Sequence, residues 1–283
     1  MFNLTLSPAQ TELVIKPGIT LTQVYFVTNN SEEVIILTPS VLPFTPLGLD
    51  GSVTYDETVQ NPNIEFSLGN PDLKLNQNFR LNPGQKTELT LQIKTYPQIP
   101  PGDNYYTFFI SEAADTTFNT IPQSTARLGS HLLLSLSDTE NPASQGKIQA
   151  FTASPRFKDI FLTPITFHAQ AKNNSDFFFK TTGTLTITKN KLIIAETKLD
   201  SQNVLANYSR NLTCQNQQPC TISPPFWPGQ YTATITLVNT SSASPASITF
   251  FVFPFSFFLG IIILFLLYLT SKRLFNKLHH ASK

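Results

Sequence analysis

Two cysteines are the residues in this sequence whose type and spacing are best suited to chemistry. Cys214 and Cys220 are separated by five residues in the segment CQNQQPC, and turn formers lie between them. This spacing favours a small loop closed by a disulfide. Metal binding is the weaker interpretation, because the chain has no second Cys or His pair with ligand spacing. A reduced pair on a loop is the remaining alternative, and it would be expected if this part of the chain faced the cytosol.

Histidines and catalytic motifs give little sign of an active site. The four histidines are His131, His168, His279 and His280. On a predicted strand, His168 alternates with the apolar Phe167 and Ala169, so it is expected to face solvent. The sequence contains no G-x-S-x-G, H-E-x-x-H, phosphate-loop or G-x-G-x-x-G motif. We therefore predict no catalytic residue, no cofactor and no enzymatic activity.

Three carboxylates, Asp50, Asp56 and Glu57, occur in one polar stretch and could offer oxygen ligands to Ca²⁺. Their spacing matches no defined calcium loop, and acidic residues in a polar loop are usually solvated. No metal site is therefore predicted.

Two groups of aromatic residues are candidates for binding a partner. The first is Phe177, Phe178 and Phe179, which follow one another along the chain. Consecutive residues of a strand point to opposite faces, so at least one of these rings is expected to be exposed. A second sheet or another domain could also cover it, which is the alternative to binding.

The second aromatic group is Phe226 and Trp227, beside a Pro-Gly turn that precedes a predicted strand at Tyr231–Val238. If this strand runs toward the membrane, Trp227 lies at the far end of its domain. Packing between domains is then favoured over contact with a ligand.

A membrane span is predicted near the C-terminus. Residues 211–271 contain no Asp, Glu, Lys or Arg, and Ile248 to Leu269 is a nearly continuous apolar run of 22 residues. As a helix this run would be about 33 Å long, close to the ~30 Å hydrocarbon core of a bilayer. A buried core helix would keep a polar stripe, which this run lacks. We therefore predict a transmembrane helix at 248–270 that contacts membrane lipid.

The charges beside this span predict its orientation. Lys272, Arg273, Lys277 and Lys283 follow it in a basic tail, 271–283, whereas the preceding flank has no charge. The positive-inside rule places the C-terminus in the cytoplasm and the larger N-terminal part outside the cell membrane. The N-terminus, MFNLTLSPAQ, shows no signal peptide. A removed signal and a misplaced gene start are favoured over a tail-anchored protein with cytosolic domains.

The outer part of the chain is predicted to be all-β. Charged residues are only 13% and the net charge is +1, which argues against a nucleic-acid partner. Apolar and polar residues alternate along much of residues 5–238, which is typical of strands that pair into two closed sheets. The clearest strands are Glu88–Lys94, Leu132–Leu136, Ile165–Ala171, Leu185–Ile187 and Tyr231–Leu237.

Weak internal repeats favour two immunoglobulin-like β-sandwich domains followed by one transmembrane α-helix. PPGDNYYTFFI and WPGQYTATITL each place a Pro-Gly turn before a Tyr-led strand, and VTNNS resembles AKNNS. The polar stretch Asp138–Gly146 is the predicted linker. Domain one is then 1–140 with a long inserted loop at about 39–79, and domain two is 147–240. A stalk, Ser241–Ser247, would join domain two to the membrane.

Four segments of the sequence resemble a known family of proteins. They are KPG, ITLTQVYFVTNNSEEVIIL, LNPGQKTELTLQIKT and IPPGDNYYTFFI. These segments resemble bacterial surface proteins with two immunoglobulin-like domains and a C-terminal membrane helix, of which the WxL-interacting proteins are the best known. More distantly, they are similar to the fimbrial chaperone sandwich. The resemblance implies a surface-anchored binding or scaffolding role and assigns no individual residue.

Two functions follow as hypotheses. The first is a non-enzymatic, membrane-anchored adhesion or binding protein whose sandwich edges and loops hold a protein or a cell-wall polymer. The alternative is a structural or assembly subunit of a membrane complex, in which the transmembrane helix makes the main contacts.

Overall fold

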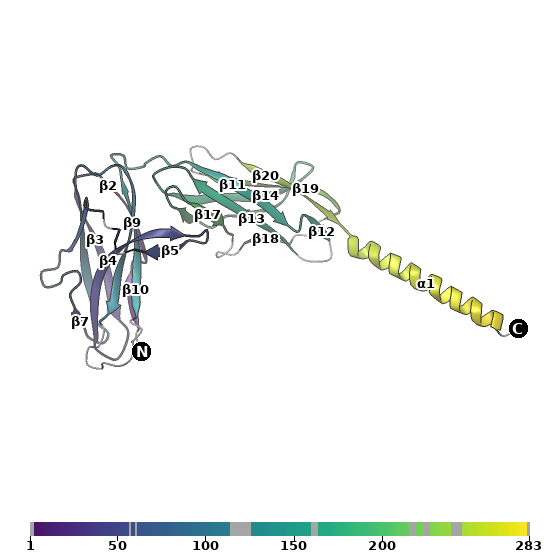
Figure 1. Ribbon diagram of the computed structural model, residues 1–283, viewed down its shortest axis with the longest axis horizontal. Coiled ribbons are helices and arrows are strands. Elements are labelled where there is room, and N and C mark those ends of the chain that lie inside the picture. The colour runs from purple at the N-terminus through teal and green to yellow at the C-terminus, as the bar shows by residue number, and fades with distance from the viewer. Residues whose placement is uncertain are drawn as a thin grey trace. The chain divides into compact units, whose positions relative to one another are not determined.

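A computed structural model of the chain describes residues 3–281, except 57, 60, 114–125, 160–163, 215–218, 224–226 and 239–244. Contacts divide the chain into two compact units. Unit 1 comprises Met1–Ser144 with the short segments Asn173–Phe178 and Leu205–Tyr208, and unit 2 comprises the rest. Each unit is a β-sandwich, and a helix follows the second one (Figure 1). The predicted fold class is therefore confirmed.

Unit 1 consists of two sheets packed face to face. The first sheet has the spatial order β1 (Leu4–Ser7), β3 (Thr20–Asn29), β8 (Lys86–Thr95) and β6 (Ile64–Leu68). The second has the order β2 (Gln10–Ile15), β10 (Arg127–Leu136), β9 (Gly102–Glu112), β4 (Ile35–Leu47) and β5 (Ser52–Tyr55), and β7 (Phe79–Leu81) also pairs with β4. Alternate side chains of both sheets fill the core, where Tyr25, Phe108 and Leu132 are fully buried.

Unit 2 has the same kind of sandwich with its own core. Its smaller sheet has the order β11 (Gly146–Ser154), β13 (Ile165–Asn173) and β17 (Ser209–Leu212), and β18 (Cys220–Ile222) also pairs with β13. The larger has the order β12 (Phe157–Asp159), β20 (Ala246–Phe253), β19 (Gly229–Val238), β14 (Phe179–Lys189) and β15 (Leu192–Lys198), and β16 (Gln202–Val204) pairs with β14. Phe167, Tyr231 and Phe250 are central to this core.

The first strand of each unit is divided between the two sheets. β1 pairs antiparallel with β3, whereas β2 pairs parallel with β10, the last strand of unit 1. In the same way β11 lies beside β13, whereas β12 pairs parallel with β20, the last strand of unit 2. Pro8 and Pro155 stand at the two breaks, where a residue without an N–H ends one ladder. The two units therefore share one topology.

Both sequence repeats occupy equivalent places in the two units. Gly102 opens β9 and Gly229 opens β19, each of which lies directly beside the last strand of its unit. Their φ angles are 140° and 142°, a region of backbone conformation that favours glycine. The Pro-Gly pairs therefore mark the same turn into the same strand.

The second repeat is a turn built on a buried asparagine. Asn29 Nδ2 donates to the Glu33 carbonyl at 2.8 Å, and Asn29 Oδ1 accepts from the backbone N–H and the hydroxyl of Ser31 at 2.9 and 2.7 Å. Asn173 makes the same three bonds to the residues two and four positions further on, at 2.9, 2.9 and 2.7 Å. Both asparagines are fully buried. Each side chain thus satisfies the backbone at the end of its strand, β3 for Asn29 and β13 for Asn173.

The strands predicted from alternation are confirmed, but the predicted long loop at residues 39–79 is wrong. β4 continues to Leu47, and β5 and β6 follow within the same stretch. Prolines 39 and 43 suggested a loop because proline removes a ladder donor. In β4 both are paired with β9, and the Pro39 carbonyl faces the other way, toward the backbone N–H of Asn76. A proline whose missing N–H would point away from the partner strand does not interrupt the ladder.

The predicted span at 248–270 begins too early. Residues 248–253 belong to β20, and the helix, α1, runs from Phe255 to Ala281. Composition could not separate the two, because a strand with a buried face and a lipid-facing helix are both apolar. Domain two therefore extends to Phe253, the predicted stalk contributes Ala246 and Ser247 to β20, and the predicted tail at 271–283 continues the helix to Ala281.

One part of α1 is long and apolar enough to cross a membrane. Phe255–Arg273 has 19 residues, a mean hydropathy of 2.0 and no burial within the chain. At about 1.5 Å per residue it would be about 28 Å long, near the ~30 Å of a hydrocarbon core.

The buried asparagine turn can be tested by a pair of neighbouring substitutions. Asn29→Ala removes four hydrogen bonds to buried or half-buried groups, the fourth being the bond from Asn29 Nδ2 to the Leu81 carbonyl at 3.1 Å, so we expect the free energy of unfolding of unit 1 to fall by about 3 kcal/mol. Asn30→Ala removes an exposed bond to Thr5 and should cost less than about 1 kcal/mol. Urea unfolding of both variants in detergent measures the difference, and equal losses would contradict the role of Asn29.

Candidate functional site: an open strand edge in unit 1

The edge of β6 is the candidate binding site of unit 1. β6 pairs with β8 on one side, and none of the described residues pairs with its other side. An unpaired strand edge presents a row of N–H and C=O groups that can accept another strand. The site is therefore built from the backbone as well as from side chains.

Two hydrogen bonds show which backbone groups face outward. Gly69 N donates to the Thr90 carbonyl at 2.7 Å, and Tyr96 N donates to the Asn63 carbonyl at 3.0 Å. Backbone groups along a strand alternate between its two sides, so the odd-numbered residues of β6 face β8. The N–H and C=O groups of Phe66 and Leu68 consequently point to the open side.

The strand across from this edge has fewer backbone donors because of two prolines. Pro39 and Pro43 of β4 have no N–H to offer on the side that faces away from β9, and the Pro39 carbonyl already accepts from Asn76 N at 2.8 Å. Proline on an edge is a common protection against strand addition. The two edges that flank the opening therefore differ, since β4 lacks the donors of Pro39 and Pro43, whereas β6 keeps those of Phe66 and Leu68.

A groove of about 440 Å³ lies between these two edges. Its floor is apolar and its rim is polar. The residues that line it are Val41, Pro43, Asn61, Pro62, Ile64, Glu65, Phe66, Leu75, Asn76, Tyr96 and Tyr106. The Phe66 and Tyr106 rings meet edge to face with centroids 4.7 Å apart, which fixes the floor of this groove, named here the edge groove.

The rim of the edge groove carries an ionised carboxylate. Tyr96 donates its hydroxyl to Glu65 Oε2 at 3.1 Å, and Lys94 Nζ donates to the same oxygen at 3.3 Å. The bond from Tyr96, followed by that from Lys94, holds the pKa of Glu65 below its usual value. Glu65 is therefore a fixed acceptor at neutral pH.

Tyr106 supplies a neutral polar group inside the edge groove. Burial raises the pKa of Tyr106 to about 12, so its hydroxyl stays protonated. This hydroxyl has no hydrogen-bond partner among the residues that the structure describes. A bound segment could therefore exchange a hydrogen bond with it.

This site was not predicted from the sequence because β6 lay inside the predicted loop. The signal that could have found it is the alternation of Ile64, Phe66 and Leu68 with polar residues. Asparagines and prolines on either side concealed this short alternation.

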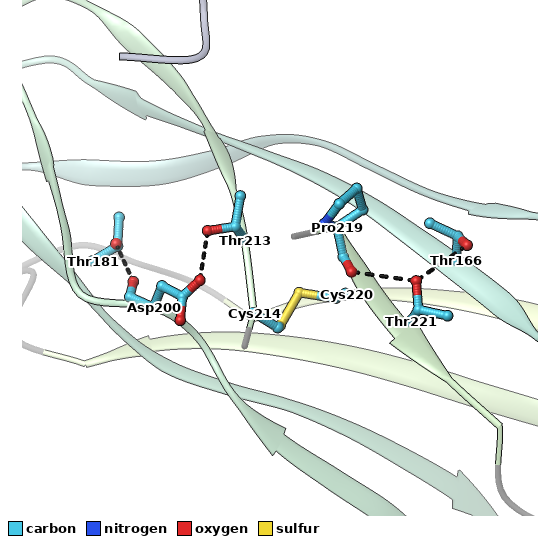
Figure 2. The surroundings of a disulfide bond; sticks show 8 residues. All are labelled: Thr166, Thr181, Asp200, Thr213, Cys214, Pro219, Cys220 and Thr221. Atoms are coloured by element: carbon cyan, nitrogen blue, oxygen red, sulfur yellow. Dashed lines mark hydrogen bonds between the residues drawn. A yellow bond between two sulfur atoms is a disulfide. The ribbon is translucent and has the colours of Figure 1, made fainter. Parts of the chain in front are cut away.

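The predicted cysteine pair lies in the core of unit 2. The structure joins Cys214 and Cys220 by a disulfide with a Cα–Cα separation of 4.8 Å, and both side chains are buried (Figure 2). Cys220 opens β18, and Cys214 follows β17. β17 and β18 pair with successive parts of β13, so the disulfide closes the excursion between two halves of one interrupted strand.

Hydrogen bonds secure both ends of this excursion. Thr213 Oγ1 donates to Asp200 Oδ2 at 2.8 Å, and Thr181 Oγ1 donates to the Asp200 carbonyl at 2.9 Å (Figure 2). At the other end Thr221 Oγ1 donates to the Pro219 carbonyl at 3.2 Å. The disulfide and these hydrogen bonds therefore hold the same segment of unit 2 in place.

The three consecutive phenylalanines do not form an exposed surface. Phe179 is buried in the core of unit 2, and Phe177 and Phe178 are half-buried. At least one of these rings was expected to be exposed, but two are only partly exposed and one is buried, because the chain turns before Phe179 and β14 begins only there.

Trp227 lies at the end of unit 2 opposite to the one predicted. β19 pairs antiparallel with β20, with Gly229 beside Val252, and β20 leads directly into α1. The strand at Tyr231–Val238 therefore runs away from α1, and Trp227 stands near the start of the helix. Phe226 lies outside the described residues.

Histidines and carboxylates form no cluster in the part of the chain that the structure describes. His168 is exposed, as predicted from strand alternation. No group of three or more His, Cys, Asp or Glu that could hold a metal ion occurs there, and Glu57 lies outside it.

Comparison with known proteins gives matches to solved structures alone. No family model and no curated protein matches the sequence. A class 5 fimbriae chaperone, CfaA, matches at 12% identity over 89% of this chain and 100% of its own, with a TM-score of 0.45. The E. coli chaperone DraB matches at 12% over 87% and 98% with 0.40, and the Pseudomonas aeruginosa chaperone CupB2 at 11% over 88% and 100% with 0.39. The match to the class 5 fimbriae chaperone agrees with the distant resemblance to the fimbrial chaperone sandwich. No family model supports the nearer resemblance to the WxL-interacting proteins.

The disulfide predicts a measurable contribution to stability. The two cysteines are 6 positions apart in the sequence. Breaking their disulfide should lower the free energy of unfolding by about 2 kcal/mol, because the unfolded chain gains conformational entropy. We expect dithiothreitol, or the double change Cys214→Ala and Cys220→Ala, to lower the unfolding free energy of unit 2 by that amount and to leave unit 1 unchanged. Alkylation followed by mass measurement on protein taken directly from cells gives the redox state, and two free thiols there would contradict an oxidised pair.

Proposed function

We propose that this chain is a non-enzymatic, single-pass membrane protein that holds an extended segment of a protein partner along β6. The observation that carries the proposal is the outward-facing backbone of Phe66 and Leu68 beside the edge groove. An added strand would pair with these groups, and alternate side chains of that strand would enter the groove. A wall polymer has no ladder of N–H and C=O groups at strand spacing, so a polypeptide is favoured.

The proposal places both sandwiches outside the cytoplasm of a cell membrane. Phe255–Arg273 has the length and composition of a span, and Lys272 and Arg273 stand at its C-terminal end, with Lys277 and Lys283 beyond. The positive-inside rule favours a cytoplasmic C-terminus. An outer location also favours the disulfide of unit 2.

A pair of substitutions at one position tests the role of the backbone in binding. Leu68→Pro removes an N–H that faces the open side, whereas Leu68→Ala removes more of the side chain but keeps the N–H. With the photo-crosslinking residue p-benzoylphenylalanine at Asn61 on the rim, we expect a discrete protein adduct in the native host. The adduct should fall at least about tenfold in Leu68→Pro and little in Leu68→Ala, as expected for a lost edge pairing.

Equal adduct yields in the two Leu68 variants would overturn strand addition at β6. A heterogeneous adduct that wall-degrading enzymes remove would point to a polymer. Urea unfolding of both variants serves as the control, since β6 should remain paired with β8 in each.

A second candidate is an assembly subunit held in a membrane complex by α1. The absence of burial along Phe255–Arg273 favours it, because each face of that segment is open to another helix or to lipid. A Cβ added at Gly260 meets no atom within 4 Å, so Gly260→Leu would disturb a contact with a partner helix and not the chain itself. Loss of partner recovery in this variant, with Leu68→Pro unaffected, would favour the second candidate.

The orientation can be tested by protease treatment of intact cells or spheroplasts. We expect external protease to digest the two sandwiches and to leave a C-terminal tag protected. Complete protection of the sandwiches would place them in the cytosol, and digestion of the tag alone would reverse the orientation. Extraction by alkaline carbonate without detergent would contradict the span itself.

A further inference from the structure

The outer face of β20 changes from polar to aromatic as the strand approaches α1. Ser247 and Thr249 are exposed on this face, and they are followed on it by Phe251 and Phe253, which are exposed as well. Their neighbours Phe250 and Val252 are buried in the core of unit 2. The core therefore does not account for the two outer rings.

The neighbouring strand extends this aromatic surface. β12 pairs parallel with β20 and brings Phe157 beside Phe251, with ring centroids 5.6 Å apart. Phe157 is 63% exposed. Phe253 in turn stacks against Phe258 of α1 at 5.3 Å. Two ring pairs thus lead from the sheet to the first turn of the helix.

A hydrogen-bonded cap fixes the start of α1 to the same strands. Asp159, the last residue of β12, accepts from the backbone N–H of Ser256 at 2.5 Å and from its hydroxyl at 2.8 Å. A carboxylate at a helix N-terminus satisfies free N–H groups and complements the helix dipole. Figure 1 shows α1 leaving unit 2 at the end where β12 lies. The two ring pairs and the start of the helix therefore lie at one place.

Trp227 lies at this same end of unit 2. It precedes Gly229, whose partner in the sheet is Val252, and it is 77% exposed. Trp227 is the only tryptophan in the chain. Among the residues that the structure describes, most of its apolar surface is therefore left uncovered.

The turn between β14 and β15 brings two more exposed apolar side chains to this end of unit 2. Lys189 Nζ donates to the Pro228 carbonyl at 2.9 Å, which places this turn beside Trp227. Leu192 and Ile193 follow the turn and are 69% and 65% exposed. Lys189 and Lys191 add positive charge beside these apolar side chains.

We infer that these side chains form a surface that enters the interfacial layer of the bilayer. This lipid-facing surface consists of Phe157, Leu192, Ile193, Trp227, Phe251 and Phe253. The inference rests on the membrane anchoring proposed above and deepens it, because it adds a second lipid contact made by strands. The occupant is the lipid bilayer, since a membrane that receives α1 from Phe255 meets Phe253 and its neighbours at once.

The composition of the surface suits that layer. Tryptophan is enriched at membrane–water interfaces, where its ring lies at the level of the headgroups. Apolar side chains that enter the boundary between headgroups and acyl chains reach about 5–10 Å into it, and lysines beside them contact lipid phosphates. Unit 2 is consequently held against the membrane instead of turning freely about a stalk.

The single tryptophan provides a direct test in the full chain, reconstituted in vesicles of phosphatidylcholine and phosphatidylglycerol. We expect blue-shifted Trp227 emission that falls to about half with nitroxide-labelled lipid carrying its label near the headgroup, and less with a label deep in the acyl region. Trp227→Phe combined with Leu192→Trp should behave in the same way. Trp227→Phe combined with Val238→Trp is the matched control, because Val238 is 53% exposed at the other end of β19, about 30 Å away.

The outcomes separate this inference from the proposed function. Flotation with the vesicles and resistance to carbonate would support the anchor. If, in the same protein, Trp227 emission is as red and as little quenched as that of the Val238→Trp control, the lipid-facing surface is overturned and the anchor stands. If the chain does not float with the vesicles, both the anchor and the surface are overturned. Strong quenching of Trp227 and of Leu192→Trp without quenching of the control supports the inference.

Discussion

The need to bury one face of every sheet is the constraint from which both units follow. Each sheet has alternating apolar residues that cannot remain in water, so two sheets must close over one another. Closure leaves strand edges, and on one side of each sandwich the divided first strand forms the edge of both sheets. Pro8 and Pro155 allow this change of sheet because neither can continue the first ladder. The same solution occurs twice in one chain.

Different edges of these sheets have different chemistry. β4 is protected by Pro39 and Pro43, whereas β6 keeps outward-facing N–H groups beside an apolar groove. In unit 2, β12 at one edge of the larger sheet caps α1 through Asp159 and carries an exposed phenylalanine. One edge is thus suited to a polypeptide and the other to lipid. Such a division would let the chain hold a partner at one unit while the other unit is fixed to the membrane.

Local patterns in the sequence predicted much of the fold. Alternation identified strands such as Glu88–Lys94 and Tyr231–Leu237, and the Pro-Gly and Asn-Asn-Ser repeats marked equivalent turns in both units. The sequence could not separate β20 from α1, because Ile248–Phe253 and the helix that follows are equally apolar. Their difference lies in which residues find a core to enter, and only the tertiary structure supplies it.

The candidate sites were harder to predict than the strands. Trp227 was assigned to the wrong end because the direction of β19 depends on its pairing with β20, which no local pattern contains. β6 was missed because five residues of alternation between Asn and Pro resemble a loop. The exposed ring expected at Phe177–Phe179 is only half-buried or buried for a related reason, since a turn precedes Phe179. In each case the missing information was a contact between residues distant in the chain.

The buried asparagine turns also have a consequence for covalent modification. Asn29 and Asn173 each stand two residues before a serine and so match the acceptor sequence for N-linked glycans. In the folded units their Nδ2 atoms already donate to backbone carbonyls at 2.8 and 2.9 Å, and the side chains have no exposed surface. A sugar could reach these nitrogens only before the turns form. Folding thus closes two of the chain's acceptor sequences to oligosaccharide transfer, in whatever cell produces it.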